Sequence, residues 1–387
     1  MEMSQSLIKL LSILKILLLF SSTLLAQERI CGNEYLKYPN TLKNNEHEIF
    51  NSNRSPISIE VVIHVVYNTQ SENISDNLIS SQLEILNQAF NAENADLSQV
   101  PYEFKNIIAN VGIRFCLASK DEKGNNANGI IRVPTSKKEI GLTDDLYFTN
   151  RSGSDAWNTD KYLNIWVANT GDNISGFGTF PGMSDFYKTG LVIHPKYFGK
   201  NNHPKYGLGK TTVHELGHFF GLLHTWGETS DCNEDDGIND TPLQMKSYKG
   251  CPPYPQSGCS ESEMFMNFMD YVDDKCMYFF TTGQKEKMLS VLEVYRKELK
   301  NVDIECHSKE ANDFTLFPNP TDGIFNIEPS YYLDEEINIY SLDCRKMKTE
   351  IFKTEKSIEV NIGNQPQGLY IVKVKNLKPK LLYKIWE

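Results

Sequence analysis

The sequence predicts an α+β domain followed by a small all-β domain. In the first part, Ser58 to Tyr67 is rich in β-branched residues and contains no turn residue, which is typical of a central strand. Ser75 to Phe90 instead repeats its apolar residues at helical spacing. After about residue 313, short strand-like runs follow one another closely, which indicates a β-sandwich. We therefore expect a twisted mixed sheet with helices over residues 56–300, a linker over 301–312 and a small all-β sandwich over 313–387.

Three more strands are expected in the first domain: Val111–Cys116, Tyr162–Ala168 and Gly190–His194. His64 lies inside the central strand. A lone histidine in a buried strand is more often a core residue than a ligand, so we leave His64 out of the site.

Two helices are expected around this sheet. The first would be capped by Ser75 and would face the sheet through Ile79, Leu83, Leu86 and Phe90. The second would cover Thr281–Tyr295 and close the domain, with an apolar face of Met288, Val291, Leu292 and Tyr295.

The run from His214 to His224 carries the chemistry. His214 and His218 are four residues apart, so on a helix their rings project from one face and can hold one cation. Gly221 can adopt positive φ and turn the chain, which would bring His224 round as a third ligand. Three imidazole ligands with one position left for water are the catalytic arrangement of zinc. Glu215 stands beside the first ligand, where it could take a proton from that water and deliver it to a leaving amine, so the run indicates peptide hydrolysis.

This zinc helix is expected to begin near Thr211 or Thr212, either of which could be its cap. The alternative interpretation is an amphipathic helix whose histidines only pack against a core.

The extended histidine run resembles the zinc signature of the metzincin metallopeptidases. Asn267–Tyr271 fits the methionine turn of that clan, with Met269 as an apolar floor beneath the imidazoles. His-Thr-Trp after the helix, the loop Asp236–Pro242 and the segment from Asp274 to Thr281 resemble the pappalysin family, in particular its ulilysin-like members of the cytophagalysin group. The resemblance runs from about residue 57 to about residue 299 and implies a metzincin-type catalytic domain.

The resemblance also implies roles for residues around the metal. Tyr271 would hydrogen-bond the oxyanion of the tetrahedral intermediate. Asp274 would select Arg or Lys after the scissile bond, with Asp273 as the alternative. The loop from residue 236 offers hard oxygen ligands of the kind that calcium takes, although a solvated acidic turn is the alternative. The calcium ligands would be Asp236, the carbonyl of Ile238, Thr241 and, as a weaker candidate, Asp240.

Four of the eight cysteines follow the zinc helix closely: Cys232, Cys251, Cys259 and Cys276. Four cysteines allow three pairings, which spacing alone does not rank. A second zinc site is the alternative, but no Cys-x-x-Cys spacing occurs. The pappalysin resemblance implies that Cys232 pairs with Cys259 and Cys251 with Cys276. Spacing leaves the state of Cys116, Cys306 and Cys344 open.

The amino terminus predicts export and latency. Residues 1–26 combine an early lysine, a short apolar run and Ala26, which is typical of a secretory signal peptide. Residues 27–55 are polar and would form a pro-segment. Cys31, between Arg29 and Gly32 in sequence, resembles the cysteine switch of metzincin pro-segments, in which a thiolate binds the zinc of the latent form. A disulfide to Cys116 or Cys306 is the alternative for Cys31.

The segment Gly176–Gly182 contains glycines and a proline, which fit an edge strand. In metzincins such a strand pairs with substrate main chain, and Phe177–Phe180 fits it by position. A plain loop is an equal alternative.

The carboxy-terminal tail is a separate unit. Its strands are expected at Ile324–Ile327, Ile337–Tyr340, Ile358–Ile362, Leu369–Val374 and Leu381–Ile385. Pro-Asn-Pro-Thr-Asp-Gly at its start and Gly-Leu-Tyr-Ile-Val-Lys-Val near its end resemble the sorting domain of type IX secretion, which implies a Bacteroidetes-type bacterium and a secreted or cell-surface protein. Asp343-Cys344 departs from the glycine usual in the middle of that domain. A carbohydrate- or protein-binding module is the alternative.

The whole chain therefore predicts a secreted zinc endopeptidase that acts on proteins or peptides and is delivered by the type IX machinery. A formal charge of -11 disfavours nucleic acid and anionic membranes as partners. No transmembrane segment is expected in the mature chain. The alternative function is a non-catalytic, calcium-stabilised adhesin on a metzincin fold, which predicts that the base, a ligand or the turn methionine is lost. All of these residues are present.

Overall fold

The computed structural model of the chain describes residues 30–35, 57–182, 185–227, 229, 231–300, 306, 314–328, 336–353, 358–374 and 379–385. The expected signal peptide and most of the expected pro-segment lie outside these residues. None of the described helices is long and apolar enough to cross a membrane.

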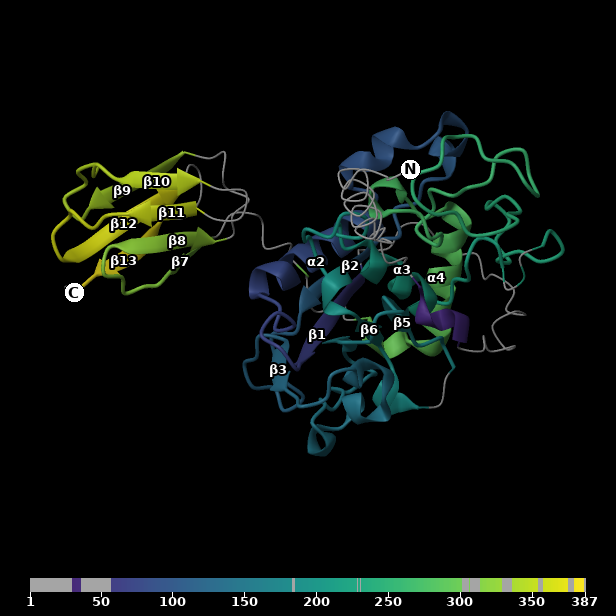
Figure 1. Ribbon diagram of the computed structural model, residues 1–387, viewed down its shortest axis with the longest axis horizontal. Coiled ribbons are helices and arrows are strands. Elements are labelled where there is room, and N and C mark those ends of the chain that lie inside the picture. The colour runs from purple at the N-terminus through teal and green to yellow at the C-terminus, as the bar shows by residue number, and fades with distance from the viewer. Residues whose placement is uncertain are drawn as a thin grey trace, which may run out of the picture.

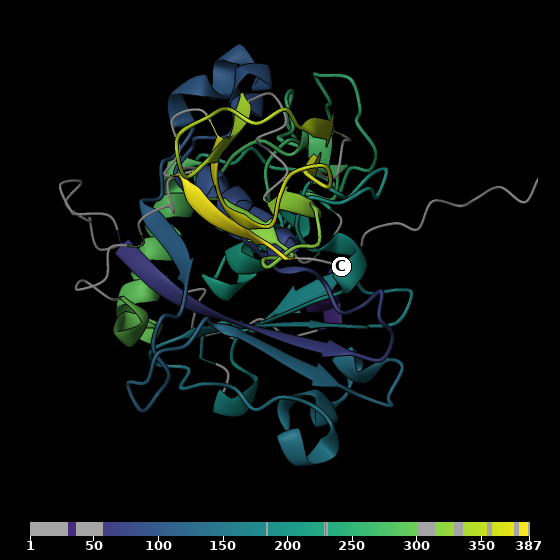
Figure 2. The ribbon, with the colours of Figure 1, turned by 90° about the vertical axis from the view of Figure 1, so that its left-hand side faces the viewer.

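The first domain contains a mixed, twisted sheet (Figures 1 and 2). Its strands follow the order β2-β1-β4-β6-β5, and β3 also pairs with β1. The longest is β1 (Ile57–Tyr67), which is buried along nearly its whole length because sheet neighbours flank it on both sides. The other strands are β2 (Ile113–Leu117), β3 (Ile130–Pro134), β4 (Leu163–Ala168), β5 (Gly176–Gly178) and β6 (Leu191–Ile193). All these pairings are parallel except that of β5 with β6, so an antiparallel strand forms one edge.

His64 of β1 is a core residue, as the sequence predicted. Its ring nitrogens lie 2.8 Å from Ser154 Oγ and 2.9 Å from Asn164 Oδ1, and the ring stacks on Trp166. Burial lowers the pKa of His64 to about 4, so the ring is neutral near pH 7.

Helix α2 (Asp76–Phe90) packs against the sheet and against the zinc-motif helix α3 (Lys210–Phe219). Ser75 caps α2 as expected, because its hydroxyl accepts from the backbone N–H of Leu78. Gln82 of α2 then fixes α3: its side chain donates to Gly209 O and accepts from Thr212 Oγ1. The two helices are therefore connected by polar contacts as well as by the core.

The expected cap of α3 is wrong. The helix begins at Lys210, one or two residues before either threonine, and Thr211 and Thr212 are buried inside its first turn. The N-cap is Gly209, which has φ 71° and supplies no side chain. Asp274 replaces that side chain from a distant part of the chain, because its Oδ2 accepts from the backbone N–H groups of Leu208 and Lys210.

Helix α4 (Thr282–Tyr295) closes the domain and starts with a capping box between Thr281 and Gln284. Asp240 supports the same start, since its two carboxylate oxygens accept from Thr281 Oγ1 at 2.6 Å and from the Gly283 N–H at 2.8 Å. The buried face of the helix is Met288, Val291, Leu292 and Gln284, whereas Tyr295 is only half-buried.

Three disulfides connect distant segments. Cys232 pairs with Cys259 and Cys251 with Cys276, which are the pairings that the family resemblance implied. Cys116 pairs with Cys306, whose backbone N–H donates to Ser58 Oγ. This third disulfide leaves neither of the two proposed disulfide partners available to Cys31.

The tail forms two antiparallel sheets with a core of its own, drawn in yellow-green in Figure 1. One sheet has the order β10-β11-β8-β7 and the other β13-β12-β9. All five expected strands occur, and β7 and β10 are additional. Their bounds are β7 (Thr315–Phe317), β8 (Ile324–Glu328), β9 (Ile337–Ser341), β10 (Glu350–Lys353), β11 (Ile358–Asn361), β12 (Gly368–Val374) and β13 (Lys380–Lys384). Cys344, which stands near the position of the usual glycine, is exposed and has φ 62°, a conformation that favours glycine.

Candidate active site and metal centre

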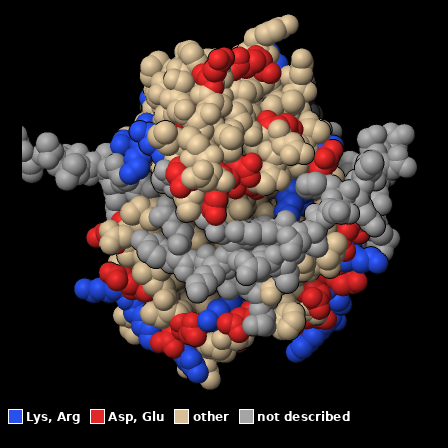
Figure 3. Space-filling model, turned by 90° about the vertical axis from the view of Figure 1, so that its right-hand side faces the viewer, with Lys and Arg blue, Asp and Glu red and all other residues tan. Residues whose placement is uncertain are grey.

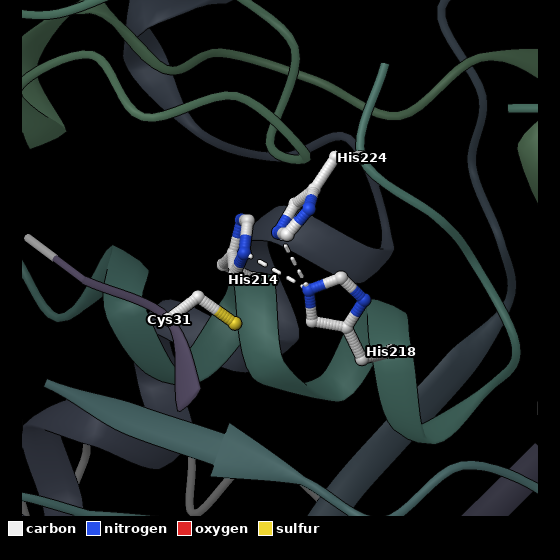
Figure 4. Close-up of side chains that lie close together, drawn as sticks. All are labelled: Cys31, His214, His218 and His224. Carbon is white, nitrogen blue, oxygen red and sulfur yellow. Dashed lines mark hydrogen bonds between the residues drawn. The ribbon is translucent and has the colours of Figure 1, made fainter. Parts of the chain in front are cut away.

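Helix α3 and the turn after it bring three histidines together (Figure 4). Nε2 of His218 lies 3.1 Å from Nε2 of His214 and 3.1 Å from Nε2 of His224. The first two come from successive turns of α3, and Gly221, with φ 85°, reverses the chain so that the third reaches the same point. The side chains at 214, 218 and 224 are buried.

Backbone carbonyls orient two of these rings. Nδ1 of His214 lies 2.8 Å from Phe268 O, and Nδ1 of His218 lies 2.8 Å from Leu222 O. A carbonyl only accepts, so each Nδ1 carries the proton and each Nε2 directs a lone pair to the shared point. Burial also lowers the pKa of His218 to about 4 and that of His224 well below its usual value. Lone pairs packed this closely repel one another unless a cation lies between them, so the donor set fits zinc.

The methionine turn lies against the same helix. A Cβ added to Gly217 would lie 2.3 Å from Met269 Sδ, so only glycine lets the sulfur approach the helix between His214 and His218. The turn is held by Asn267, whose Oδ1 accepts from the Met269 N–H and whose amide pairs with Gln284 of α4. Gly217 was not predicted as a site residue. The sequence feature that could have indicated it is a glycine within an otherwise helical run that is buried throughout.

Trp226 supports the third histidine and was also not predicted as a site residue. Its ring stacks on His224 with centroids 4.4 Å apart and planes 5° from parallel. Tyr271 packs against both rings, and its hydroxyl lies 3.1 Å from His224 Nε2. The phenol therefore reaches the point where the three imidazoles converge.

Strand β5 runs close over Glu215. A Cβ at Gly178 would lie 2.5 Å from the Glu215 carbonyl oxygen, and one at Gly176 would lie 3.3 Å from Glu215 Cγ. The two glycines therefore allow the edge strand to lie directly on α3. The Glu215 side chain is fully buried beneath it.

Residues 30–33 occupy the outer edge of β5. The Ser175 N–H donates to Ile30 O, Cys31 forms a parallel bridge with Gly176, and Asn33 both donates to and accepts from the backbone of Gly178. Gly176–Gly178 is thus an edge strand rather than a plain loop, and it already has a strand partner. Asn33 was not predicted as a contact, because its partner is 145 residues away.

The same pairing places the Cys31 thiol among the histidines (Figure 4). One ligand atom each from Cys31, His214, His218 and His224 lies within 4.8 Å of all the others. The Cys31 sulfur is also 3.3 Å from Glu215 Oε2. Thiolate sulfur and imidazole nitrogen are both zinc ligands, and four such donors fit its tetrahedral geometry.

The loop predicted to bind calcium has one orphaned oxygen. Asp236 Oδ1 accepts from the Ile238 N–H and from Thr241 Oγ1, whereas Oδ2 is buried with no hydrogen-bond partner among the described residues. Burial raises the pKa of Asp236 to about 8. Asp236, the Ile238 carbonyl and Thr241 therefore gather oxygens at one place, whereas the Asp240 carboxylate is committed to the start of α4.

The two acidic residues of the predicted specificity pocket are both buried. Asp274 Oδ2 is the cap of α3 described above. Asp273 Oδ1 is buried without a hydrogen-bond partner in the described part of the chain. A capping role for Asp274 was not foreseen, because Leu208 and Lys210 are 66 and 64 residues away in sequence.

The site defines a zinc metallopeptidase of the metzincin type. It combines a helix that carries two histidines, a glycine turn that leads to a third histidine, and a methionine beneath the three rings. Comparison with known proteins agrees. Residues 148–293 match the peptidase family described as Pregnancy-associated plasma protein-A, and residues 315–386 match the Secretion system C-terminal sorting domain.

The chain is similar to solved structures of promirolysin and mirolysin. It is 42% identical to promirolysin of Tannerella forsythia, with a TM-score of 0.61 over 64% of this chain and 84% of that one. Mature mirolysin of the same organism, solved with a cleaved peptide, is 41% identical, with a TM-score of 0.60 over 64% of this chain and 99% of that one. An extracellular metalloprotease of Trichophyton verrucosum is 28% identical over 62% of this chain and 79% of its own length. The chain belongs to the pappalysin family, and it is a zinc metalloendopeptidase that carries a type IX sorting domain.

Proposed function

We propose that the protein cleaves peptide bonds within exported or extracellular proteins, with His214, His218 and His224 as the zinc ligands and Glu215 as the general base. The observation that carries this proposal is the convergence of three Nε2 atoms at 3.1 Å, with two of the rings oriented by backbone carbonyls. Neutral imidazoles aimed at one buried point are poor core packing and good metal ligands.

Several residues of the chain have separate roles in the proposed reaction. When bound, zinc lowers the pKa of attacking water and polarises the scissile carbonyl. Glu215, buried beside the ligands, accepts the proton of that water and returns it to the leaving amine. The Tyr271 hydroxyl donates to the carbonyl oxygen as negative charge develops there, which favours the transition state over the bound substrate. The free edge of β5 aligns the substrate main chain once residues 30–33 have left it.

The proposed calcium site is structural and consists of Asp236, the Ile238 carbonyl and Thr241. A cation there would satisfy the orphaned Asp236 oxygen and favour its charged form. Asp240 contributes less directly, because it holds the start of α4.

Removal of the metal tests the central proposal. We expect a zinc chelator to abolish casein hydrolysis by the matured protein and stoichiometric zinc to restore it, because no group of the site supplies a comparable electrophile. Removal of calcium with a calcium-selective chelator should instead lower the melting temperature of the protein at chelator concentrations that leave its activity unchanged, because the proposed calcium site is structural. Undiminished hydrolysis by a preparation shown to be free of metal would exclude the peptidase mechanism and favour the second candidate, a non-catalytic adhesin on the same fold.

We also propose a preference for Arg or Lys after the scissile bond, with Asp274 as the selecting residue. Asp274→Asn keeps one oxygen to cap α3 but removes the charge, so we expect selectivity for Arg over Ala at this position to fall about tenfold or more, the loss of a charge-assisted hydrogen bond. Cleavage-site profiling on a peptide library measures this ratio. Asp273→Asn is the matched control: unchanged selectivity is expected, and a loss there alone would move the pocket to Asp273.

The carboxy-terminal sorting domain supports export of the protein. We propose that a signal peptide over residues 1–26 and the sorting domain direct the protein through type IX secretion in a Bacteroidetes-type bacterium, with that machinery and peptide substrates as its partners. Figure 3 shows acidic and basic side chains interspersed over the described part of one face. The formal charge of -11 supports cationic peptides rather than nucleic acid as ligands.

A further inference from the structure

A cavity lies further along the edge of β5 than the metal site. It has a volume of about 330 Å³, and its walls include the aromatic side chains of Phe180, Phe186 and Tyr295. Gly182 and polar or charged residues make up the rest of the wall. None of these residues belongs to the zinc site or to the mechanism described above. Phe180 connects the two places, because its ring packs edge-on against the His218 ring at 5.5 Å.

The direction of β5 relates this cavity to a bound peptide. Residues 30–33 run parallel to β5, with Cys31 opposite Gly176 and Asn33 bonded to Gly178. Phe180 follows two residues later on the same edge. At roughly 3.3 Å per residue, it lies about 13 Å along the strand from Gly176.

Arg296 forms part of the cavity wall and is held by several contacts. Arg296 stacks on the Phe219 ring at 3.5 Å and donates to Phe219 O and to Thr179 O. It thereby ties the end of α3 to the segment that continues β5. Arg296 also lines the cavity, so this wall is positioned by the same elements that hold the zinc ligands.

One wall is an exposed aromatic side chain. Phe186 is 70% exposed, whereas Phe180, which also lines the cavity, is 3% exposed. Leaving a phenylalanine ring in water is unfavourable, and aromatic walls around a concave site are typical of pockets that receive an aromatic side chain. Phe180 and Gly182 of the cavity wall also follow β5 directly in the chain, the edge strand that already pairs with residues 30–33.

We propose that this cavity is a substrate subsite that receives an aromatic side chain three to five residues before the cleaved bond. The inference rests on the proposed peptidase function and assigns it a second specificity determinant. Antiparallel pairing makes the more linear hydrogen bonds, so a substrate on β5 runs opposite to residues 30–33. Its amino-terminal side then extends toward Phe180 and Phe186.

The test uses the matured full-length protein and peptides with one cleavable centre. A single position is varied from two to six residues before the cleaved bond. We expect Phe, Tyr or Trp to exceed Ala in kcat/KM by about tenfold within the window of three to five residues, mainly through KM, because the contact is made equally in the ground and transition states. In Phe186→Ala this ratio should fall below about threefold.

Two controls separate the possible failures. Tyr102→Ala removes another exposed aromatic ring, one that does not line the cavity, and should keep the tenfold ratio. Thr189→Trp should fill the cavity and lower the ratio as Phe186→Ala does. Absence of cleavage of any peptide by the unsubstituted protein would contradict the peptidase function itself. Three results would overturn the subsite alone. They are cleavage without an aromatic preference in the window, an aromatic preference on the carboxyl side of the cleaved bond, and an unchanged ratio in Phe186→Ala.

Discussion

Replacing Glu215 with alanine should lower kcat by at least about a hundredfold while zinc remains bound, the contribution expected of a positioned general base. The side chain is buried beneath β5 and its Oε2 lies 3.3 Å from the Cys31 sulfur, whereas the proposed ligands are His214, His218 and His224. Removal of the carboxylate would therefore take away the proposed proton acceptor without taking away a proposed metal ligand. Initial rates on a quenched peptide and the zinc content of the purified variant measure the two quantities.

Glu215→Gln is the matched variant because it keeps the shape of the side chain and loses only its basicity. It should be as inactive as Glu215→Ala. Full activity in either variant would contradict the assignment of the base, and loss of zinc together with activity would show that Glu215 acts on the metal instead. A preference for Arg after the scissile bond would also let the protein cut its own precursor at Asn53-Arg54. Sequencing the amino terminus of both variants beside the active protein tests this self-maturation, since identical processing would exclude it.

The metal site was predictable because its signal is local. The spacing of His214 and His218 and the glycine before His224 act within eleven residues, a range over which helix geometry determines which side chains meet. The pattern of apolar residues in the sequence likewise predicted strand β1 and the helices α2 and α4. Strand β3 was missed because it is short, only half-buried and ends in a proline, so it carries neither a long apolar run nor a clear alternation.

Contacts between distant segments could not be predicted in this way. The threonines at the start of α3 are good capping residues. The capping carboxylate comes instead from Asp274, which accepts from backbone N–H groups before both threonines, and the helix begins at Lys210. Gly217 is informative only when Met269 is known to lie against it. In both cases the local preference of the chain was overridden by a tertiary contact.

The contacts between distant segments all support the zinc-motif helix α3. Asp274 fixes the start of the zinc helix, and the methionine turn supports its underside. Arg296 holds its end against the continuation of β5. Each of these supporting segments lies about fifty residues or more beyond the end of α3 in sequence. The contacts that hold the histidines in place therefore depend on the later part of the domain. A site held from both ends is pre-organised for a metal ion.

The second large effect is expected from Cys31. Its sulfur lies within 4.8 Å of the ligand nitrogens of all three histidines, so we propose that it is the zinc ligand that keeps the precursor latent. A tethered ligand competes at an effective concentration in the millimolar range or above, which substrate rarely reaches. Cys31→Ser should therefore raise the activity of the uncleaved precursor at least about tenfold and leave the activity of the matured protein unchanged. Cleavage of a quenched peptide by both forms, with precursor integrity checked on a gel, measures the effect.

Cobalt substitution distinguishes a sulfur ligand from simple blockage of the cleft. The precursor with cobalt in the site should show a thiolate-to-cobalt absorption band that is lost in Cys31→Ser and kept in Cys344→Ser, which removes the exposed thiol of the tail. Because Asn33 and Ile30 also bind the edge of β5, main-chain pairing alone could hold the segment in the cleft. A Cys31→Ser precursor that stays inactive would assign latency to that pairing. An active precursor that has lost its cobalt band would instead identify the sulfur as the switch, with the pairing serving to deliver it to the metal.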